Sequence, residues 1–150
     1  MFDYSRHERI KAKHDDAMAV AKRLQEQSIL LVHHSARAKC RTEWDLLRID
    51  YSGVICDSAV QGLRRQMLPL RMATNGAIED LTGALTLSGA AFDTDLWTPQ
   101  TPPSAVIVRP DQYARSQEFC ALLARCGVAR TCWLPHRLSD AKSWLEQVLE

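Results

Sequence analysis

The pattern of apolar and polar positions first predicts a long helix near the N-terminus. Within residues 5–27, aliphatic and small side chains recur at helical spacing and face away from a strongly charged side. These apolar side chains are Ile10, Ala17, Ala21 and Leu24. The stripe predicts an N-terminal amphipathic helix that either packs on the domain or contacts a second subunit or partner. We therefore divide the chain into a helical arm at residues 1–28 and an α/β domain at residues 29–150.

Shorter apolar stretches after this helix predict an antiparallel hairpin. Residues 29–34 have the composition of a strand, and residues 35–43 are polar and predict a loop. Apolar and polar residues alternate over residues 44–51, which predicts a second strand. The two strands would pair across the loop.

The middle of the chain is less regular. Residues 57–72 carry one apolar helical face, which Pro69 is expected to kink or shorten. Residues 77–88 fit a helix or a strand, and the helical spacing of their aliphatic side chains favours a helix in the first half. Residues 89–103 are rich in proline and aspartate and predict a loop long enough to be a flap or a lid.

The last third alternates strand and helix. A continuous apolar run at residues 104–108 predicts a strand covered on both faces, followed by a helix at residues 111–126. A short strand at residues 131–134 precedes a terminal helix that Ser139 would cap. This order is typical of parallel strands with crossover helices. The expected fold is therefore α/β, a single-domain mixed β-sheet flanked by helices.

Composition narrows the class of protein. The 19 Lys and Arg residues nearly balance the 18 Asp and Glu residues, which argues against a dedicated nucleic-acid binder. No apolar run approaches the roughly 20 residues that span a bilayer, and the charged start lacks the apolar core of a signal peptide. The five cysteines are odd in number and irregularly spaced, as expected of reduced thiols. We therefore expect a cytoplasmic protein without a transmembrane segment.

The stretch from Asp50 to Leu63 is the strongest candidate for a functional site. It predicts the end of a buried strand, a short polar turn and a helix that Asp57 or Ser58 would cap. In α/β proteins, such loops at the carboxyl ends of strands commonly bind ligands or partners. The candidate interaction and regulatory residues are Ser52, Gly53, Cys56, Asp57, Ser58 and Gln61.

This stretch resembles the signature of STAS domains, the family of the anti-sigma-factor antagonists. In that family, a strand ending in Asp-Leu-Ser-Gly-Val is followed by Asp-Ser-Ser-Gly-Leu at the start of a helix. Here residues 50–54 read Asp-Tyr-Ser-Gly-Val, and Asp57-Ser58 opens the second half after a connection one residue shorter than usual. The terminal helix, with Ala141 before Trp144-Leu145, is similar to the STAS-like branch related to the CRAL-TRIO lipid-binding fold. The resemblance implies a STAS-like fold and a regulatory role.

One departure changes what the resemblance implies. The serine that is phosphorylated in the antagonists is replaced by Ala59, and Val60 stands where the motif has glycine. The usual phosphoswitch is therefore not expected at position 59. Ser58 remains open to modification, where the helix N-terminus would favour a phosphate, or it is simply a helix cap.

Other chemistry finds less support in the sequence. Cys56 before a helix could be a nucleophile or a buried thiol, but a phosphatase-type loop needs arginine at position 62, where the chain has Gly62. Adjacent His33 and His34 on a strand point to opposite faces, so they form no zinc pattern with Cys40. We expect no metal and no cofactor.

Three hypotheses follow. The first is a non-enzymatic, bacterial-type regulatory or scaffolding domain that binds a protein partner, or a second copy of itself, through residues 52–61. The second is a binder of a small apolar or lipidic ligand in a cavity under residues 89–103, with Trp97 in the lid. The third is an enzyme that uses Cys56 or Ser58, which would need a nearby histidine as base. The sequence favours the first.

Overall fold

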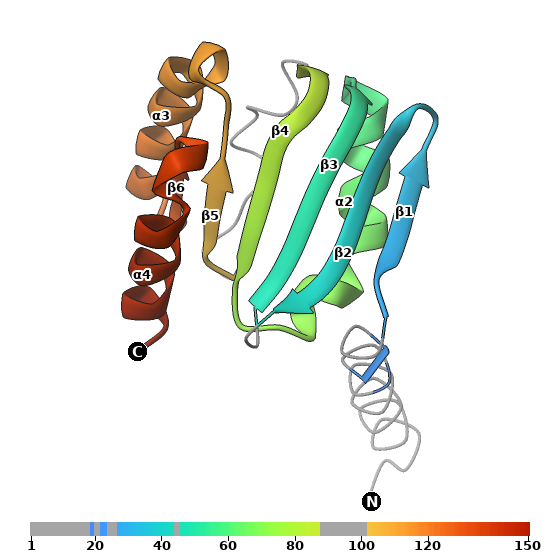
Figure 1. Ribbon diagram of the computed structural model, residues 1–150, viewed down its shortest axis with the longest axis horizontal. Helices are drawn as coiled ribbons and strands as arrows, with labels where there is room; N and C mark the ends of the chain where they lie inside the picture. Colours follow the sequence, from blue (N-terminus) through green and yellow to red (C-terminus); the bar gives the residue numbers. More distant parts are fainter. Residues whose placement is uncertain (1–18, 20–21, 24–26, 44–45, 88–101) are drawn as a thin grey trace, which may run out of the picture.

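A mixed sheet organises the part of the chain that the structure describes. The computed structural model describes residues 19, 22–23, 27–43, 46–87 and 102–150, and these residues contain a six-stranded sheet with its strands in chain order (Figure 1). The strands are β1 (Ile29–His33), β2 (Ala36–Glu43), β3 (Leu46–Ile55), β4 (Ala77–Leu87), β5 (Ser104–Ile107) and β6 (Arg130–Trp133). The helices are α2 (Asp57–Met72), α3 (Pro110–Arg125) and α4 (Leu138–Leu149), with a short 3₁₀ helix at Pro135–Arg137. The expected α/β class with a mixed sheet is confirmed.

The first half of the sheet is an antiparallel meander, not a single hairpin. β1 pairs with β2, and β2 pairs with β3, so the loop predicted at residues 35–43 is wrong because those residues form β2. Residues along β2 alternate between buried and exposed positions. The buried positions are Ala36, Ala38 and Cys40, and the exposed ones are Arg37, Lys39 and Arg41. Small buried side chains satisfy the strand pattern without giving a strong apolar signal.

The second half of the sheet is parallel. β3, β4, β5 and β6 run parallel to their neighbours, and the strand–helix–strand–helix order predicted for the last third is confirmed. The helix favoured for the first half of residues 77–88 is wrong, because β4 is extended from Ala77 to Leu87. Ile78 and Glu79 are both buried, on opposite faces of the sheet. A central strand between two parallel neighbours loses contact with water on both faces.

The helices form where apolar periodicity predicts them, but their capping differs from expectation. Pro69 lies inside α2 and the helix continues to Met72. Arg137, and not Ser139, is the N-cap of α4, and it makes no side-chain capping hydrogen bond. None of the described helices is long and apolar enough to cross a membrane.

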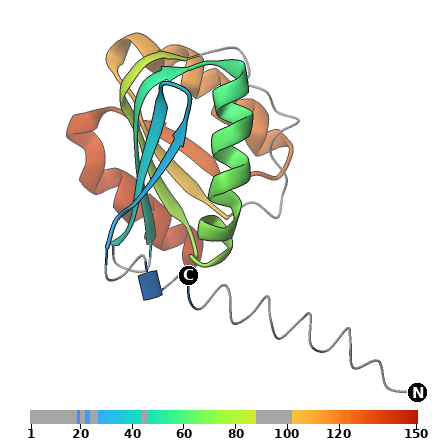
Figure 2. The same cartoon turned by 90° about the vertical axis from the view of Figure 1, so that its right-hand side faces the viewer.

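The helices cover the two faces of the sheet unequally. Ile49, Glu79 and Val106 are in register on one face, and the core clusters there include residues of α2 and α3. Ile78 and Ala105 lie on the other face and pack against α4. Figure 2 shows α2 and α4 on opposite sides of the sheet. On this face α4 packs mainly on β5 and β6, and it meets the meander at Leu46 of β3 and Glu43 of β2. Farther along the same face, Leu30 and Val32 of β1 and Arg37 and Lys39 of β2 are exposed.

Two expected features fall on residues that the structure does not describe. The N-terminal helix expected at residues 5–27 lies outside the described residues except at positions 19, 22, 23 and 27. The loop predicted at residues 89–103, with Trp97, is described only at positions 102 and 103. The arm and the proposed ligand cavity therefore stay predictions.

Candidate functional site

The residues predicted from the sequence lie along the end of β3 and the start of α2. Ser52 and Gly53 belong to β3, which continues to Ile55, so the turn is shorter than expected and consists of Cys56 alone. Ser58 and Gln61 are exposed in the first turns of α2. Ser52 instead points to the face of the sheet opposite α2, where it pairs with Arg37 in register. The predicted residues therefore form two neighbouring groups on either side of the sheet.

Two glycines of this stretch allow close contact with the β1–β2 hairpin. Gly53 has φ +83°, and a Cβ atom there would lie 2.0 Å from the carbonyl oxygen of Ser35. A Cβ atom on Gly62 would lie 2.3 Å from Nδ1 of His33. Any side chain at Gly53 would also be strained by the left-handed backbone conformation. The end of β3 and the second turn of α2 therefore both pack closely against the β1–β2 hairpin.

Cys56 is the N-cap of α2, in place of the expected Asp57 or Ser58, and makes no side-chain capping bond. Its Sγ lies 3.3 Å from Oγ of Ser58. The Ser58 hydroxyl, and then the backbone N–H of Ala59, lower the pKa of the Cys56 thiol from its ordinary value. Among the described residues, no hydrogen bond joins a histidine to Cys56 or Ser58. The geometry therefore gives a half-buried thiol of lowered pKa at the helix N-terminus, with no hydrogen bond from it to a described histidine that could act as a base.

A second polar group, which sequence reasoning missed, is buried in the middle of the α2–α3 face. We call it the Glu79 cluster: Tyr51 of β3, Arg71 of α2, Glu79 of β4, Ser104 of β5 and Arg130 of β6. The Glu79 carboxylate accepts hydrogen bonds from the Tyr51 hydroxyl at 2.8 Å, from Nη2 of Arg71 at 2.8 Å and from Nη1 of Arg130. Arg71 also donates to Oγ of Ser104 at 3.1 Å. Polar groups therefore separate the apolar core under α2 from that under α3.

Electrostatics fix the charge state of this cluster. Burial opposes ionisation of Glu79, but the Arg130 and Arg71 guanidinium groups hold the pKa of that carboxyl far below its ordinary value. Burial, and then the Glu79 charge, raise the pKa of Tyr51 well above its ordinary value. Glu79 is thus an ionised acceptor and Tyr51 a neutral donor at neutral pH. A carboxylate whose lone pairs are filled by three donors suits a structural role better than proton transfer.

No local pattern marks the Glu79 cluster in the sequence. Glu79 is next to Asp80 and both carboxylates look alike along the chain, yet one is buried and the other lies on the opposite face. The one available signal is weak: Ala77 and Ile78 precede the two carboxylates and Leu81 follows them. The two guanidinium partners of Glu79 come from distant segments and meet it only after folding.

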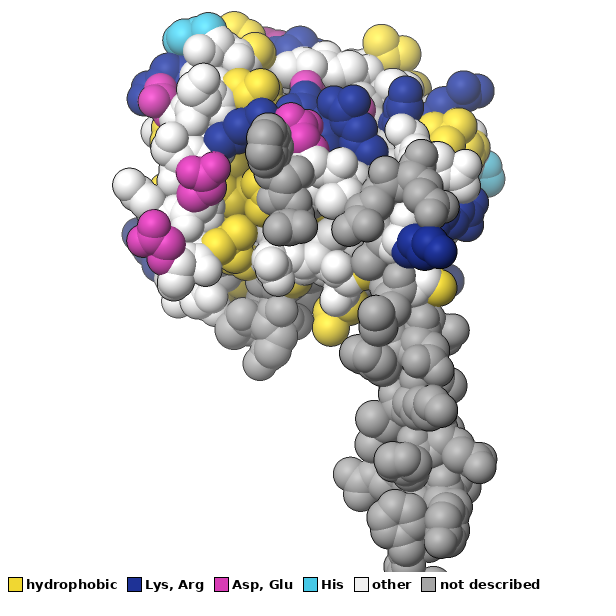
Figure 3. Space-filling model, turned by 60° about the horizontal axis from the view of Figure 1, so that its bottom comes forward, with side chains coloured by type: hydrophobic (Ala, Val, Ile, Leu, Met, Phe, Trp, Pro, Cys, Tyr) yellow, Lys and Arg dark blue, Asp and Glu magenta, His cyan; other side chains and the backbone are white. Residues whose placement is uncertain are grey.

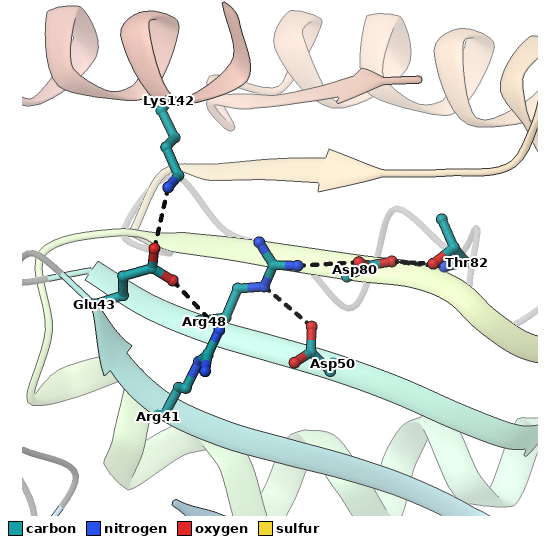
Figure 4. A network of polar contacts seen from close by, with 7 residues as sticks. All are labelled: Arg41, Glu43, Arg48, Asp50, Asp80, Thr82 and Lys142. Carbon is teal, nitrogen blue, oxygen red and sulfur yellow. Dashed lines mark hydrogen bonds and ion pairs between the residues drawn. The ribbon is translucent and has the colours of Figure 1, made fainter. Parts of the chain in front are cut away.

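A third polar group lies on the face of the sheet that carries α4 (Figure 4). Arg48 of β3 donates from Nε to Asp50 and from Nη2 to Asp80, both at 3.0 Å. The other oxygen of Asp80 accepts from the backbone N–H and the hydroxyl of Thr82, at 2.9 and 2.6 Å. This network joins β3 to β4 and leaves Arg48 well packed and only 13 % exposed.

At the edge of the same face, Glu43 of β2 links the meander to α4. Its carboxylate accepts from Nζ of Lys142 at 3.1 Å and lies 3.7 Å from Nη2 of Arg41. The hydrogen bond from Lys142 lowers the pKa of Glu43. Each described carboxylate on this face is therefore paired with a basic side chain of the same chain.

Neither a group of metal ligands nor a known relative indicates the function of this chain. The described residues contain no group of three or more His, Cys, Asp or Glu side chains that could hold a metal ion. Comparison of the chain with protein-family models, curated proteins and solved structures finds no match. The function is therefore inferred from the geometry of the chain itself.

Proposed function

We propose that this chain is a non-enzymatic regulatory or scaffolding domain with a STAS-like fold. In this proposal it binds a protein partner, or a second copy of itself, through the end of β3 and the start of α2. The STAS-like assignment is supported by the Asp50–Val54 sequence running directly into a helix and by the mixed sheet with helices on both faces. Ala59 stands where the antagonists have the phosphorylated serine, and it is completely buried. Regulation by a phosphate at that position is not part of the proposal.

The proposal rests on a backbone that is fixed by close packing against the β1–β2 hairpin while the side chains next to it are exposed. The glycine contacts with the hairpin hold the backbone at Gly53 and Gly62, whereas Ser58 and Gln61 between them point into solvent. Val54, at the end of β3, adds a partly exposed apolar side chain at 37 % exposure. Little conformational entropy is lost when a partner binds such a surface, because its backbone is already ordered.

Site-specific photo-crosslinking tests the proposal. A benzophenone amino acid placed at Gln61 should give a defined protein adduct in cells, whereas the same group at Gln117, an exposed glutamine of α3, should not. An adduct at twice the mass of the chain would identify a second copy as the partner, and sedimentation analysis would then measure its affinity. Equal adducts at both positions would contradict the proposal.

Affinity measurements with the purified partner complete the test. Gln61→Arg should weaken binding by about tenfold or more, because a large charged side chain would stand in the middle of the interface. Gln117→Arg, with the same change on α3, should leave the dissociation constant unchanged within about twofold. If both variants bind like the wild type, the start of α2 is not the interface.

A further inference from the structure

The row of basic side chains on β2 lies on an open part of the sheet. Arg37, Lys39 and Arg41 occupy alternate positions and are all exposed. Alternate residues of a strand are about 7 Å apart on the same face. Next to this row, Leu30 and Val32 of the edge strand β1 are 55 % and 46 % exposed. Dark-blue Lys and Arg side chains gather across the upper part of the view in Figure 3, with yellow apolar side chains among them.

The carboxylates of this face are already used within the chain. Arg48 forms ion pairs with Asp50 and Asp80, and both Lys142 and Arg41 form ion pairs with Glu43. Arg37 and Lys39, by contrast, have no carboxylate within 4 Å among the residues that the structure describes. Lys39 is directly opposite Asp50 in register, but Asp50 is bound by Arg48. The row therefore has a positive excess that is open to a partner.

We propose that this basic row docks an extended acidic segment of the protein partner. Acidic side chains at alternate positions of an extended segment repeat at the same spacing of about 7 Å, so two of them match Arg37 and Lys39, while Arg41 is already near Glu43. The row continues into the interface proposed above, since Arg37 is in register with Ser52 of β3. The inference thus rests on the proposed function and gives the partner its chemical class.

The same face is less suited to a phosphate polymer or a lipid surface. Asp50 stands among the basic side chains with 42 % of its side chain exposed, and it would repel a phosphate brought onto the row. The exposed described side chains of the face include no aromatic ring on which a base could stack. A protein segment can place an amide or hydroxyl opposite Asp50 and carboxylates opposite the basic side chains beside it. A phosphate polymer or a lipid surface presents negative charge at every position and cannot make this distinction.

Charge reversal tests the inference on the partner captured through Gln61. Lys39→Glu and Arg37→Glu should each weaken binding by about tenfold and reduce its salt dependence, while Lys39→Arg should bind like the wild type. Arg125→Glu, an equal change on exposed α3, is the matched control and should have no effect. A carbodiimide should join Nζ of Lys39 to a partner carboxylate with loss of water, and the joined peptide should be acidic.

The outcomes separate the two proposals. If charge reversal has no effect but Gln61→Arg weakens binding, the basic row is only a solvated surface and the inference is overturned while the proposed function stands. If Gln61 captures nothing but the carbodiimide joins Lys39 to an acidic protein segment, the start of α2 is not the interface, and the basic row is the surface that binds the acidic segment. Binding of a single-stranded RNA oligomer or of phosphatidylserine vesicles that Lys39→Glu abolishes would overturn the partner class.

Discussion

Replacing Glu79 with glutamine should strongly destabilise the fold. The carboxylate is 3 % exposed and lies between the guanidinium groups of Arg71 and Arg130. Glu79→Gln keeps the size of the side chain but removes its charge, so two buried cations lose their common counter-ion. Breaking a buried ion pair by removing one partner costs about 3–5 kcal/mol. Since small domains are stable by about 5–15 kcal/mol, the variant should lose a large part of its free energy of unfolding.

Urea unfolding followed by circular dichroism measures this loss. Tyr51→Phe removes one neutral donor to the same carboxylate and should cost about 1 kcal/mol. Glu146→Gln, at an exposed position of α4, should change the free energy of unfolding by no more than about 0.5 kcal/mol. The expected order of cost is therefore Glu79, then Tyr51, then Glu146. A cost below about 1 kcal/mol for Glu79→Gln would refute the reasoning, since the cluster would then contribute nothing through its charge.

Glu79 should also make the free energy of unfolding depend on pH in the acidic range. Because the pKa of Glu79 is lower in the folded state than its ordinary value of 4.5, its contribution is complete above about pH 4.5. It is lost progressively as the pH falls below that value towards the pKa of the folded state. Glu79→Gln should therefore flatten the acid limb of the stability curve. An acid limb of unchanged steepness in the variant would show that other carboxylates determine it.

The remaining predictions concern the turn and the surface. Gly53→Ala should lower the free energy of unfolding by about 2 kcal/mol or more, because its methyl group meets a fixed backbone carbonyl. Gly62→Ala should lower it by less, because its methyl group meets an imidazole that can rotate away. Denaturant titration of both variants compares the two losses. Ser58→Ala should raise the pKa of the Cys56 thiol and slow its alkylation by iodoacetamide at neutral pH, as mass spectrometry would show. Lys142→Met should cost less than about 1 kcal/mol, and the cost should shrink in high salt.

Helices were predictable in this chain because their apolar stripes are long. The stripe at residues 57–72 predicts the observed bounds of α2, and the apolar run at residues 104–108 marks β5. Strand β2 was missed for a physical reason: its buried positions hold only alanine and cysteine, while arginine and lysine fill the exposed ones. Strand β4 was misread because its aliphatic residues happen to recur at helical intervals. Its strand character comes from pairing with β3 and β5, which a local pattern does not contain.

The Glu79 cluster shows the same limit for sites. Its members come from four strands and one helix, and each looks like an ordinary surface residue in the sequence. Register alone brings them together, since Glu79 pairs with Ile49 on one side and Val106 on the other, in the gap between the apolar cores under α2 and α3. Predicting the cluster therefore requires the strand order first, which the sequence suggested only in part.

The predicted turn shows how structural and functional signals overlap in one motif. Gly53 and Gly62 are explained by contacts with the hairpin, so any chain with this close packing would need glycine there whatever it binds. The buried Ala59 is likewise explained by packing under α2. Gly53 belongs to the resemblance and Ala59 departs from it, yet packing explains both residues, so neither says much about a partner. Under the proposed function, binding instead depends on exposed side chains that folding does not require, Ser58 and Gln61. Substitution at these two positions should change the affinity for the partner while the free energy of unfolding stays the same.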